Sequence, residues 1–280
     1  MEIFKEIASL KAFLSQKRGS VPIGLVPTMG ALHAGHMSLI EASKKENGLT
    51  VCSIFVNPAQ FNNAKDLEKY PRTLEQDVEM LKRAGCDVVF APEAKEMYET
   101  EPTIKFDFGD LDKVLEGKFR PGHFSGVALV VAKFFNLVQP TVAYFGQKDF
   151  QQFKIIERLV KELKFDLQLK PMPILRESDG LAMSSRNMRL NDIERKKATV
   201  LFQSLAEAHK LLRAGIPLYK VKETVRQKCE SIEGVRLEYF ELAGVENLKA
   251  LEGVTDKAIL LIAAYVGEVR LIDNLLLNEN

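Results

Sequence analysis

The sequence predicts an α/β fold: a doubly wound parallel sheet followed by a second, smaller α+β domain. Short apolar runs alternate with helical stretches of about 10–15 residues through the first part of the chain. Polar clusters follow three of these runs, where the carboxyl ends of parallel strands come together. Near Pro171–Pro173 the alternation stops, and two helical stretches followed by strand-like runs replace it. The chain is therefore expected to form two domains.

The first domain, residues 1–174, is expected to be Rossmann-like. Its elements are predicted from the apolar periodicity. Helices are predicted at 2–16, 35–46, 73–84, 124–138 and 149–163. Strands are predicted at 21–27, 49–56, 87–90, 142–145 and 167–169, with an extended segment at 103–108. This alternation is typical of a parallel sheet that binds a ligand at its carboxyl edge.

The second domain, residues 175–280, has helices first and strands afterwards, which is typical of an α+β unit. Helices are predicted at 192–214 and 217–231, and strands at 235–243, 258–266 and 269–275. Ligand pockets are often found between two domains. We therefore expect this smaller domain to close over the active site.

Composition and charge exclude several classes of partner. Lys and Arg number 39 against 38 Asp and Glu, a net charge of +1 that leaves no basic field for nucleic acid. The longest apolar run, near 127–138, is interrupted by Lys133 and Asn136, so no membrane segment is expected. The 3 cysteines are widely spaced and fit neither a disulfide framework nor a zinc site. We expect small-molecule substrates and a location in the reducing cytoplasm.

The most informative segment is the turn within residues 26–40, between a predicted strand and a predicted helix. The three-residue spacing of His33 and His36 places both imidazoles on one face of the helix start. Free backbone N–H groups and the helix dipole make this position an anion site. Gly30 and Gly35 match the P-loop spacing, but His and Met replace its Lys and Ser/Thr. Imidazole donors suit an α-phosphate under attack; the alternative is a glycine turn with two unrelated histidines.

Two further segments each allow two interpretations. Asn57 and Gln60 follow a buried strand, where neutral amides either bind a hydroxyl or carboxylate or form an ordinary Asn-Pro turn. Arg120 and His123 precede a long helix, where they either face a phosphate or lie on a surface loop. The residues alone leave both questions open.

The strand-to-turn pattern recurs within residues 144–152. Gly146 permits close backbone approach, and Lys148 can bind phosphate as a compact charge. Asp149 either caps the following helix or holds Mg²⁺. Gln152 lies one turn later on the same face. The alternative is a capped surface helix without a ligand.

A loop just beyond the domain boundary combines Ser184, Ser185 and Arg186. The guanidinium group matches phosphate oxygens in a bidentate manner. Gly180 is expected to give the loop backbone freedom, which would suit a clasp that closes over a triphosphate. The alternative is a plain helix N-cap region.

Together these motifs closely resemble the pantothenate synthetase (pantoate–β-alanine ligase) family of the HxGH nucleotidyltransferase superfamily. The resemblance extends along the whole chain, and no single motif carries it alone. The matching segments are Pro27–His36, Phe55–Phe61, Tyr70–Arg72, Arg120–Gly126, Gly146–Gln152 and Met183–Asn187.

The resemblance implies an AMP-forming acid–amino-acid ligase of pantothenate biosynthesis, which supplies a coenzyme A precursor. Pantoate would attack the α-phosphate of ATP and expel pyrophosphate, and β-alanine would then attack the pantoyl adenylate and release AMP. The implied cofactor is ATP with Mg²⁺, and the implied assembly is a homodimer. No nucleic-acid or membrane partner is expected.

The resemblance also implies roles for individual residues. His33, His36, Lys148 and Arg186 are expected to be catalytic, with His36 as proton donor. Gln60 and Gln152 would hold pantoate, Gln60 also β-alanine, and Asn57 would belong to the same substrate site. Leu175 would lie at the adenine. The residues expected to bind ATP are Met29, Gly30, Ala31, Leu32, His33, Ala34, Gly35, His36, Gly146, Gln147, Lys148, Asp149, Leu175, Met183, Ser184, Ser185 and Arg186.

Some positions depart from the family pattern, and two other functions compete. Gln147 stands where Glu is usual, and Gln76–Asp77 offers one carboxylate where some members have two, so the metal ligands stay unknown. The first alternative is an adenylyltransferase of the same superfamily acting on another small substrate, which would yield an adenylylated product and no free AMP. The second is a non-catalytic nucleotide-binding module, which would bind ATP without turnover.

Overall fold

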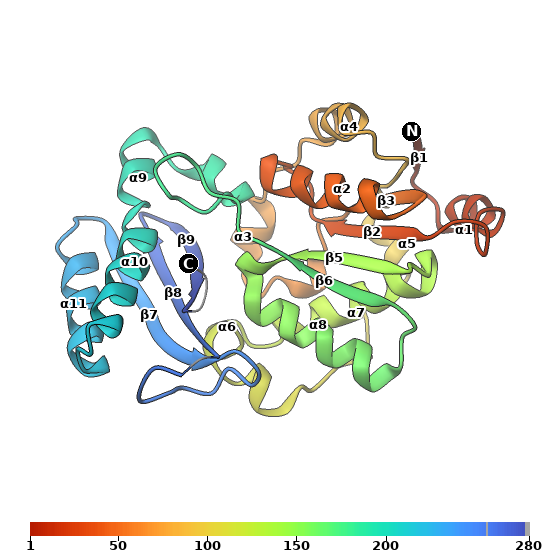
Figure 1. Ribbon diagram of the computed structural model, residues 1–280. Coiled ribbons are helices and arrows are strands. Elements are labelled where there is room, and N and C mark those ends of the chain that lie inside the picture. The colour runs from red at the N-terminus through yellow and green to blue at the C-terminus, as the bar shows by residue number, and fades with distance from the viewer. Residues whose placement is uncertain (256, 278–280) are drawn as a thin grey trace. The chain divides into compact units, whose positions relative to one another are not determined.

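The computed structural model describes residues 1–255 and 257–277, and the chain divides into two compact units. Unit 1 consists of Met1–Gln147 and Gln151–Pro173, and unit 2 of Lys148–Phe150 and the chain from Ile174 onward. Each unit has its own sheet (Figure 1). The short segment Lys148–Phe150 therefore belongs with the C-terminal part of the chain, although it follows a strand of unit 1.

Unit 1 is built on a six-stranded sheet in the order β1-β4-β3-β2-β5-β6, and its strand pairs are parallel. Its strands are continuous apolar runs because both faces of a parallel sheet are covered; Val26, Val51 and Val89 are fully buried. The strands are β1 (Glu2–Phe4), β2 (Ile23–Thr28), β3 (Leu49–Ile54), β4 (Val88–Phe90), β5 (Val142–Gly146) and β6 (Gln168–Met172).

Helices cover both faces of this sheet. Figure 1 shows α2 and α4 on one face, and α7 and α8 on the other. The helices that follow unit 1 strands are α1 (Ile7–Ser15), α2 (Ala34–Glu46), α3 (Ala64–Glu68), α4 (Leu74–Arg83), α5 (Ala94–Met97), α6 (Leu115–Phe119), α7 (His123–Val138) and α8 (Phe150–Leu163). Short 3-10 turns lie at η1 (Pro58–Gln60), η2 (Gly109–Asp112) and η3 (Gln147–Asp149).

The strand order places a topological switch between β2 and β5. From β2 the chain proceeds outward to β3 and β4, whereas from β5 it proceeds to β6 on the opposite side. In open α/β sheets ligands bind at such a switch, outside the carboxyl ends of the strands. The three predicted polar clusters follow β2, β3 and β5, which are neighbours in the sheet.

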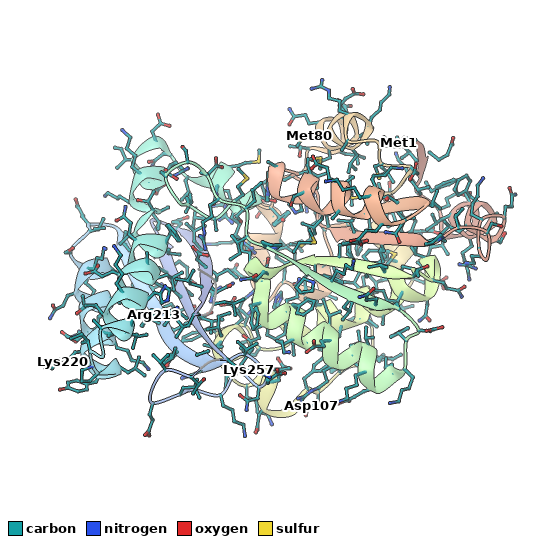
Figure 2. All side chains as sticks on the ribbon, in the orientation of Figure 1. Met1, Met80, Asp107, Arg213, Lys220 and Lys257 are labelled. Carbon is teal, nitrogen blue, oxygen red and sulfur yellow. The ribbon has the colours of Figure 1, made fainter. Side chains whose placement is uncertain are left out.

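Unit 2 has an antiparallel sheet in the order β7-β8-β9 with helices packed against it. Val221, Val225 and Cys229 recur every four residues on α11 and are buried, so this helix turns one apolar side to the sheet. Lys220, on the same helix, is exposed and extends outward (Figure 2). The elements are η4 (Ser185–Arg189), α9 (Asp192–Lys197), α10 (Val200–Arg213), α11 (Leu218–Glu230), β7 (Val235–Gly244), β8 (Ala258–Val266) and β9 (Val269–Leu276).

The predicted α/β fold class with a smaller α+β unit is confirmed, and two local helix predictions are wrong. The helix predicted at 2–16 begins only at Ile7, because Glu2–Phe4 pairs with β4 at the sheet edge. The helix predicted at 192–214 is two helices, since a capping box at Asn191 fixes the start of α9 and α10 begins separately. The segment 103–108 joins no strand, and the Phe106 N–H donates to Ser125 Oγ at 2.9 Å.

Two simpler observations concern the described residues as a whole. Among residues 1–255 and 257–277, no helix is both long enough and apolar enough to cross a membrane. Cys52, Cys86 and Cys229 are all buried free thiols.

Candidate active site

The turn between β2 and α2 brings the two predicted histidines together. The ring centroids of His33 and His36 lie 4.1 Å apart. The backbone N–H of His33 donates to Nδ1 of His36 at 3.3 Å. A ring nitrogen that accepts a hydrogen bond does not carry the proton of a neutral imidazole, so this proton lies on Nε2. His36 therefore offers an N–H donor beside the first turn of α2, where anions bind.

The same turn is held by Asp77, a buried residue of α4 that is 1 % exposed. Its two carboxylate oxygens accept from the backbone N–H groups of Ala31 at 2.9 Å and Leu32 at 2.7 Å. Ala31 has a φ of 49°, a conformation uncommon outside glycine. From the sequence, the only role expected for Asp77 is that of a metal ligand. The structure instead engages both oxygens in fixing the histidine turn.

Gln60 lies in η1, directly after β3, and it connects two predicted sites. Its Oε1 accepts from Nδ2 of Asn57 at 3.0 Å, and its Nε2 lies 3.1 Å from the sulfur of Met29. Met29 begins the predicted ATP-binding turn. The predicted pantoate and ATP residues of unit 1 are therefore in contact. With Oε1 engaged, Gln60 presents its amide N–H groups on the Met29 side.

Asn57 fixes the orientation of Gln60, and its own amide is fully engaged. Tyr98 donates its hydroxyl to Oδ1 of Asn57 at 2.8 Å, and Nδ2 of Asn57 also donates to the Gly126 carbonyl at 3.0 Å. Burial raises the pKa of Tyr98 to about 12, so this hydroxyl stays a donor at physiological pH. Oδ1 of Asn57 also accepts from the Ala59 N–H. This hydrogen bond belongs to the Asn-Pro turn that was the alternative to a substrate site.

His123 is buried at the start of α7, and its Nδ1 lies 2.8 Å from the Gln60 carbonyl oxygen. Because a carbonyl only accepts, Nδ1 carries the proton in this contact. The surface-loop interpretation of His123 is therefore wrong, because its side chain is buried and supports Gln60. A phosphate contact stays a prediction. The Arg120 guanidinium lies 3.7 Å from the Glu116 carboxylate and is only partly exposed.

Two adjacent glutamines at the start of α8 have different surroundings. Gln151 is 2 % exposed, donates to the carbonyls of Leu111 and Val114, and accepts from the Glu116 N–H. Gln152 is half-buried, and within the described chain its side chain has no recorded hydrogen bond. Gln152 is therefore the glutamine whose amide is available to a ligand. Space is also open at Gly146, where an added Cβ would meet no atom within 4 Å.

In unit 2, Lys148 and the loop 183–187 come together. Lys148, Ser184 and Asn187 line one small pocket with Asp273. Ser184 Oγ accepts from the Arg186 N–H at 3.3 Å, so Ser184 is the N-cap of η4. The remaining predicted ATP residues of this unit differ in exposure: Ser185 is buried, Leu175 is exposed, and the half-buried ones are Asp149, Met183 and Arg186.

Gly180 does not have the backbone freedom that is expected from the sequence. Its φ is 90°, and its N–H donates to the Glu177 carbonyl at 2.9 Å. A Cβ at this position would lie 2.3 Å from the Phe202 ring. Arg176 and Ala182 form a bridge across the turn. Residues 176–182 are therefore a fixed hairpin whose tight turn requires glycine.

Two further observations limit the site. A pocket of about 690 Å³ in unit 1 is lined mainly by residues 94–105 and 122–129, and none of the predicted ATP or substrate residues lines it. Within residues 1–255 and 257–277, no group of three His, Cys, Asp or Glu side chains is placed to hold a metal ion.

Comparison with known proteins identifies the family. The model of the pantoate-beta-alanine ligase family matches residues 2–276. The chain belongs to this family. It is 46 % identical to the pantothenate synthetase of Thermosipho melanesiensis over 279 residues, which cover 99 % of each chain.

Solved structures agree with this family assignment. The pantothenate synthetase of Thermus thermophilus superposes with a TM-score of 0.94 and 39 % identity over the whole of both chains. The pantoate-beta-alanine ligase of Francisella tularensis, solved with beta-gamma ATP and beta-alanine, gives 0.84 and 34 % identity over 100 % of this chain and 99 % of the other. As a member of the family, the chain is a ligase that forms pantothenate from pantoate and β-alanine. This finding excludes both the adenylyltransferase and the non-catalytic alternatives.

Proposed function

We propose that the ligation uses ATP and proceeds through a pantoyl adenylate. A carboxylate oxygen of pantoate attacks the α-phosphorus, the bond to the bridging oxygen breaks, and pyrophosphate leaves with the electron pair. The amine of β-alanine then attacks the acyl carbon, AMP leaves, and one amine proton passes to solvent. The observation that carries this proposal is the 3.1 Å contact between Gln60 Nε2 and Met29. This contact supports the proposal, because an amide suited to a carboxylate then lies beside a turn suited to phosphate, and attack of one on the other requires such proximity.

In unit 1 the proposed roles follow from the hydrogen-bonding groups of the histidine turn and of the two glutamines. His36 donates through Nε2 to the α-phosphate as charge builds on it. The glycine-containing backbone from Met29 to His36 lies against the phosphates, with His33 beside the His36 ring. Gln60 and Gln152 bind the carboxylate and hydroxyls of pantoate, because amides donate and accept without carrying charge. Asn57 acts on the substrate through Gln60.

In unit 2 the proposed roles are electrostatic. Lys148 neutralises the triphosphate, and Arg186 binds it together with the hydroxyls of Ser184 and Ser185. The backbone of Gly146–Asp149 approaches the nucleotide, and Leu175 and Met183 offer apolar surface to the adenine. No side chain forms a covalent bond, since positioning and charge stabilisation are sufficient for both steps.

Closure of unit 2 over ATP through Met183–Arg186 is part of the proposal. Because Gly180 is held in a tight turn, the hairpin 176–182 would move as one piece. Arg186→Ala should then slow adenylation more than it weakens ATP binding, because the contact tightens as charge develops. Calorimetry for ATP and single-turnover formation of pantoyl adenylate measure the two effects. Equal losses would indicate a static binding residue and contradict closure.

Three finer points complete the proposal. Mg²⁺ is expected to arrive with ATP, since Mg²⁺ in such sites is held by phosphates and few protein ligands and Asp77 is engaged by the turn. A homodimer is expected from the family resemblance, and light scattering on the purified chain tests it. A cytoplasmic location fits the three buried free thiols.

The decisive experiment measures AMP and pyrophosphate separately. With pantoate, ATP and β-alanine, equal amounts of AMP, pyrophosphate and pantothenate are expected. Without β-alanine, pantoate and ATP should yield enzyme-bound pantoyl adenylate and one pyrophosphate per site. Release of ADP and phosphate, or no pyrophosphate until β-alanine is added, would contradict the adenylate route.

A further inference from the structure

Strand β9 carries two adjacent polar residues that are almost fully buried in unit 2. Asp273 is 3 % exposed and Asn274 is 1 % exposed. Their partners across the ladder on β8 are the apolar residues Ile262 and Leu261. Burying a carboxylate and an amide is unfavourable unless both are hydrogen bonded. Their contacts within the unit therefore indicate what they do.

Asp273 binds Arg176, at the base of the hairpin 176–182. The guanidinium donates to both carboxylate oxygens, at 2.6 and 3.1 Å. It also donates to the carbonyls of Gly180 at 3.2 Å and Asn274 at 3.1 Å, and it lies over the Phe202 ring. The hairpin that leads into the predicted phosphate loop is thereby fixed to β9.

Asn274 reaches a residue 126 positions earlier. Its Nδ2 donates to the backbone carbonyl of Lys148 at 2.9 Å. The Asn274 N–H itself donates to Asp273 Oδ1 at 2.8 Å, which couples the two side chains. Because Asn274 contacts the carbonyl of Lys148, this contact does not consume the ammonium group.

The hairpin connects in turn to the phosphate loop. Nδ2 of Asn187 donates to the Ala182 carbonyl at 3.1 Å, at the end of the hairpin. Lys148, Ser184, Asn187 and Asp273 line the same small pocket. Two adjacent residues of β9 thus hold both phosphate-directed segments of unit 2, one through a backbone carbonyl and one through Arg176.

We propose that Asp273 and Asn274 are positioning residues for adenylation, which fix the Lys148 backbone and the Met183–Arg186 loop in one arrangement for the phosphates of ATP. The inference rests on the proposed function of those two segments. Both residues act through their protein contacts, the Lys148 carbonyl and the Arg176 guanidinium. They affect the step that expels pyrophosphate, because Lys148 and Arg186 neutralise the charge of the triphosphate. The pyrophosphate part of that charge has left the site before β-alanine reacts.

The test separates the two half-reactions in the full chain. Asn274→Ala is assayed for pantoate-dependent exchange of pyrophosphate into ATP, and the same sample for aminolysis of synthetic pantoyl adenylate by β-alanine. Exchange should fall on the order of 10–10²-fold, since a misplacement of about 1 Å has that effect. Aminolysis should stay near that of the wild-type chain. The ratio of the two rates is independent of the folded fraction, so a partly unfolded variant still gives an answer.

Asp273→Asn is the second variant and should lower the same ratio. Ser204→Ala is the matched control, because Ser204 is a fully buried polar residue of unit 2 whose recorded hydroxyl contact is Cys229; its ratio should be unchanged. Equal loss in both half-reactions, or unchanged exchange, would overturn the inference and leave only a structural role. A wild-type chain without pantoate-dependent exchange would overturn the proposed function itself, which is a distinguishable result.

Discussion

The histidine turn of unit 1 and the serine–arginine loop of unit 2 are both held by a buried carboxylate distant in sequence, but in different ways. Asp77 binds the turn directly, through the N–H groups of Ala31 and Leu32, 46 and 45 positions away. Asp273 acts on its loop through Arg176, 97 positions away.

The difference predicts how each region fails. A direct carboxylate–backbone contact requires two acceptor oxygens. Even an isosteric amide at Asp77, which has only one, should therefore destabilise the turn. In unit 2 the carboxylate is paired with a guanidinium that also binds two carbonyls. That arrangement depends on charge balance, because an unpaired buried charge is costly. Five measurements test this comparison.

The largest effect is expected for Arg176→Ala, which leaves the Asp273 carboxylate buried and unpaired. The free energy of unfolding should fall by about 3–5 kcal/mol, measured by urea denaturation. Burial raises the pKa of Asp273, and Arg176 opposes this shift. The loss should shrink as the pH falls through that raised pKa, because protonation then favours the folded state. A loss that stays constant down to acid pH would contradict the charge argument.

The next effect concerns one phosphate-directed donor in each unit. His36→Ala and Lys148→Ala should each slow adenylation by about 10²–10³, the effect of removing one donor to a developing oxyanion. Single-turnover formation of pantoyl adenylate measures it, with unfolding curves unchanged. His209→Ala and Lys161→Ala are matched controls outside the site. Near wild-type rates in either variant would place its phosphate contact elsewhere.

Asp77→Asn tests the direct contact. An amide can accept one backbone N–H but presents its own N–H groups to the other, so the turn should lose about 1–3 kcal/mol of stability. Adenylation should fall with it, since the turn positions His36. Glu79→Gln, an exposed change on the same helix, should stay within about 0.5 kcal/mol. If both variants behave alike in urea, the carboxylate does not hold the turn.

The sequence predicts the framework of both regions but not these supports. Apolar runs identify the strands, and parallel strands bring His36, Gln60 and Gln147 to neighbouring strand ends. Asp77 lies among other acidic residues on an amphipathic helix, where a single carboxylate is normally a solvated charge. Its function depends on a backbone conformation 46 positions away, which no local pattern encodes.

The same limit applies to unit 2 and to the N-terminal segment. Asp273 interrupts an apolar strand, yet nothing near it in sequence indicates Arg176 as its partner. Glu2–Phe4 has a helical periodicity with the residues that follow, and only pairing with β4 makes it a strand. Tertiary contacts override local preference at such positions.

Tyr98→Phe extends the comparison to a neutral support in unit 1. The Tyr98 hydroxyl donates to Asn57, which orients Gln60. Removing this hydroxyl should weaken the free energy of pantoate binding through Gln60 by about 0.5–1.5 kcal/mol. The KM for pantoate should rise and that for ATP should not. The effect should be independent of pH over the neutral range, because the pKa of Tyr98 is raised to about 12. Tyr219→Phe, at an exposed tyrosine, is the control. A change in the KM for ATP alone would contradict the network.

The smallest effect is expected for Arg195→Ala, which makes the comparison within one hairpin. Arg195 forms an ion pair with Asp179 of the same hairpin at 2.8 Å. Unlike the Asp273 carboxylate that pairs with Arg176, the Asp179 side chain is 45 % exposed. Solvent screening limits the contribution of such a pair to the free energy of unfolding to about 0.2–1 kcal/mol.

The pH dependence of this pair follows from the pKa of Asp179, which the Arg195 guanidinium lowers. The stabilisation is present above the usual aspartate pKa of about 3.9 and is lost as the pH falls through the lowered value. The losses of both variants therefore shrink as the pH falls, but that of Arg176→Ala does so at higher pH, because the pKa of Asp273 is raised and that of Asp179 is lowered. Added salt should weaken only the exposed Arg195 pair. Urea unfolding of both variants at neutral and acid pH measures the contrast, and a loss for Arg195→Ala as large as for Arg176→Ala would show that burial does not distinguish the two arginines.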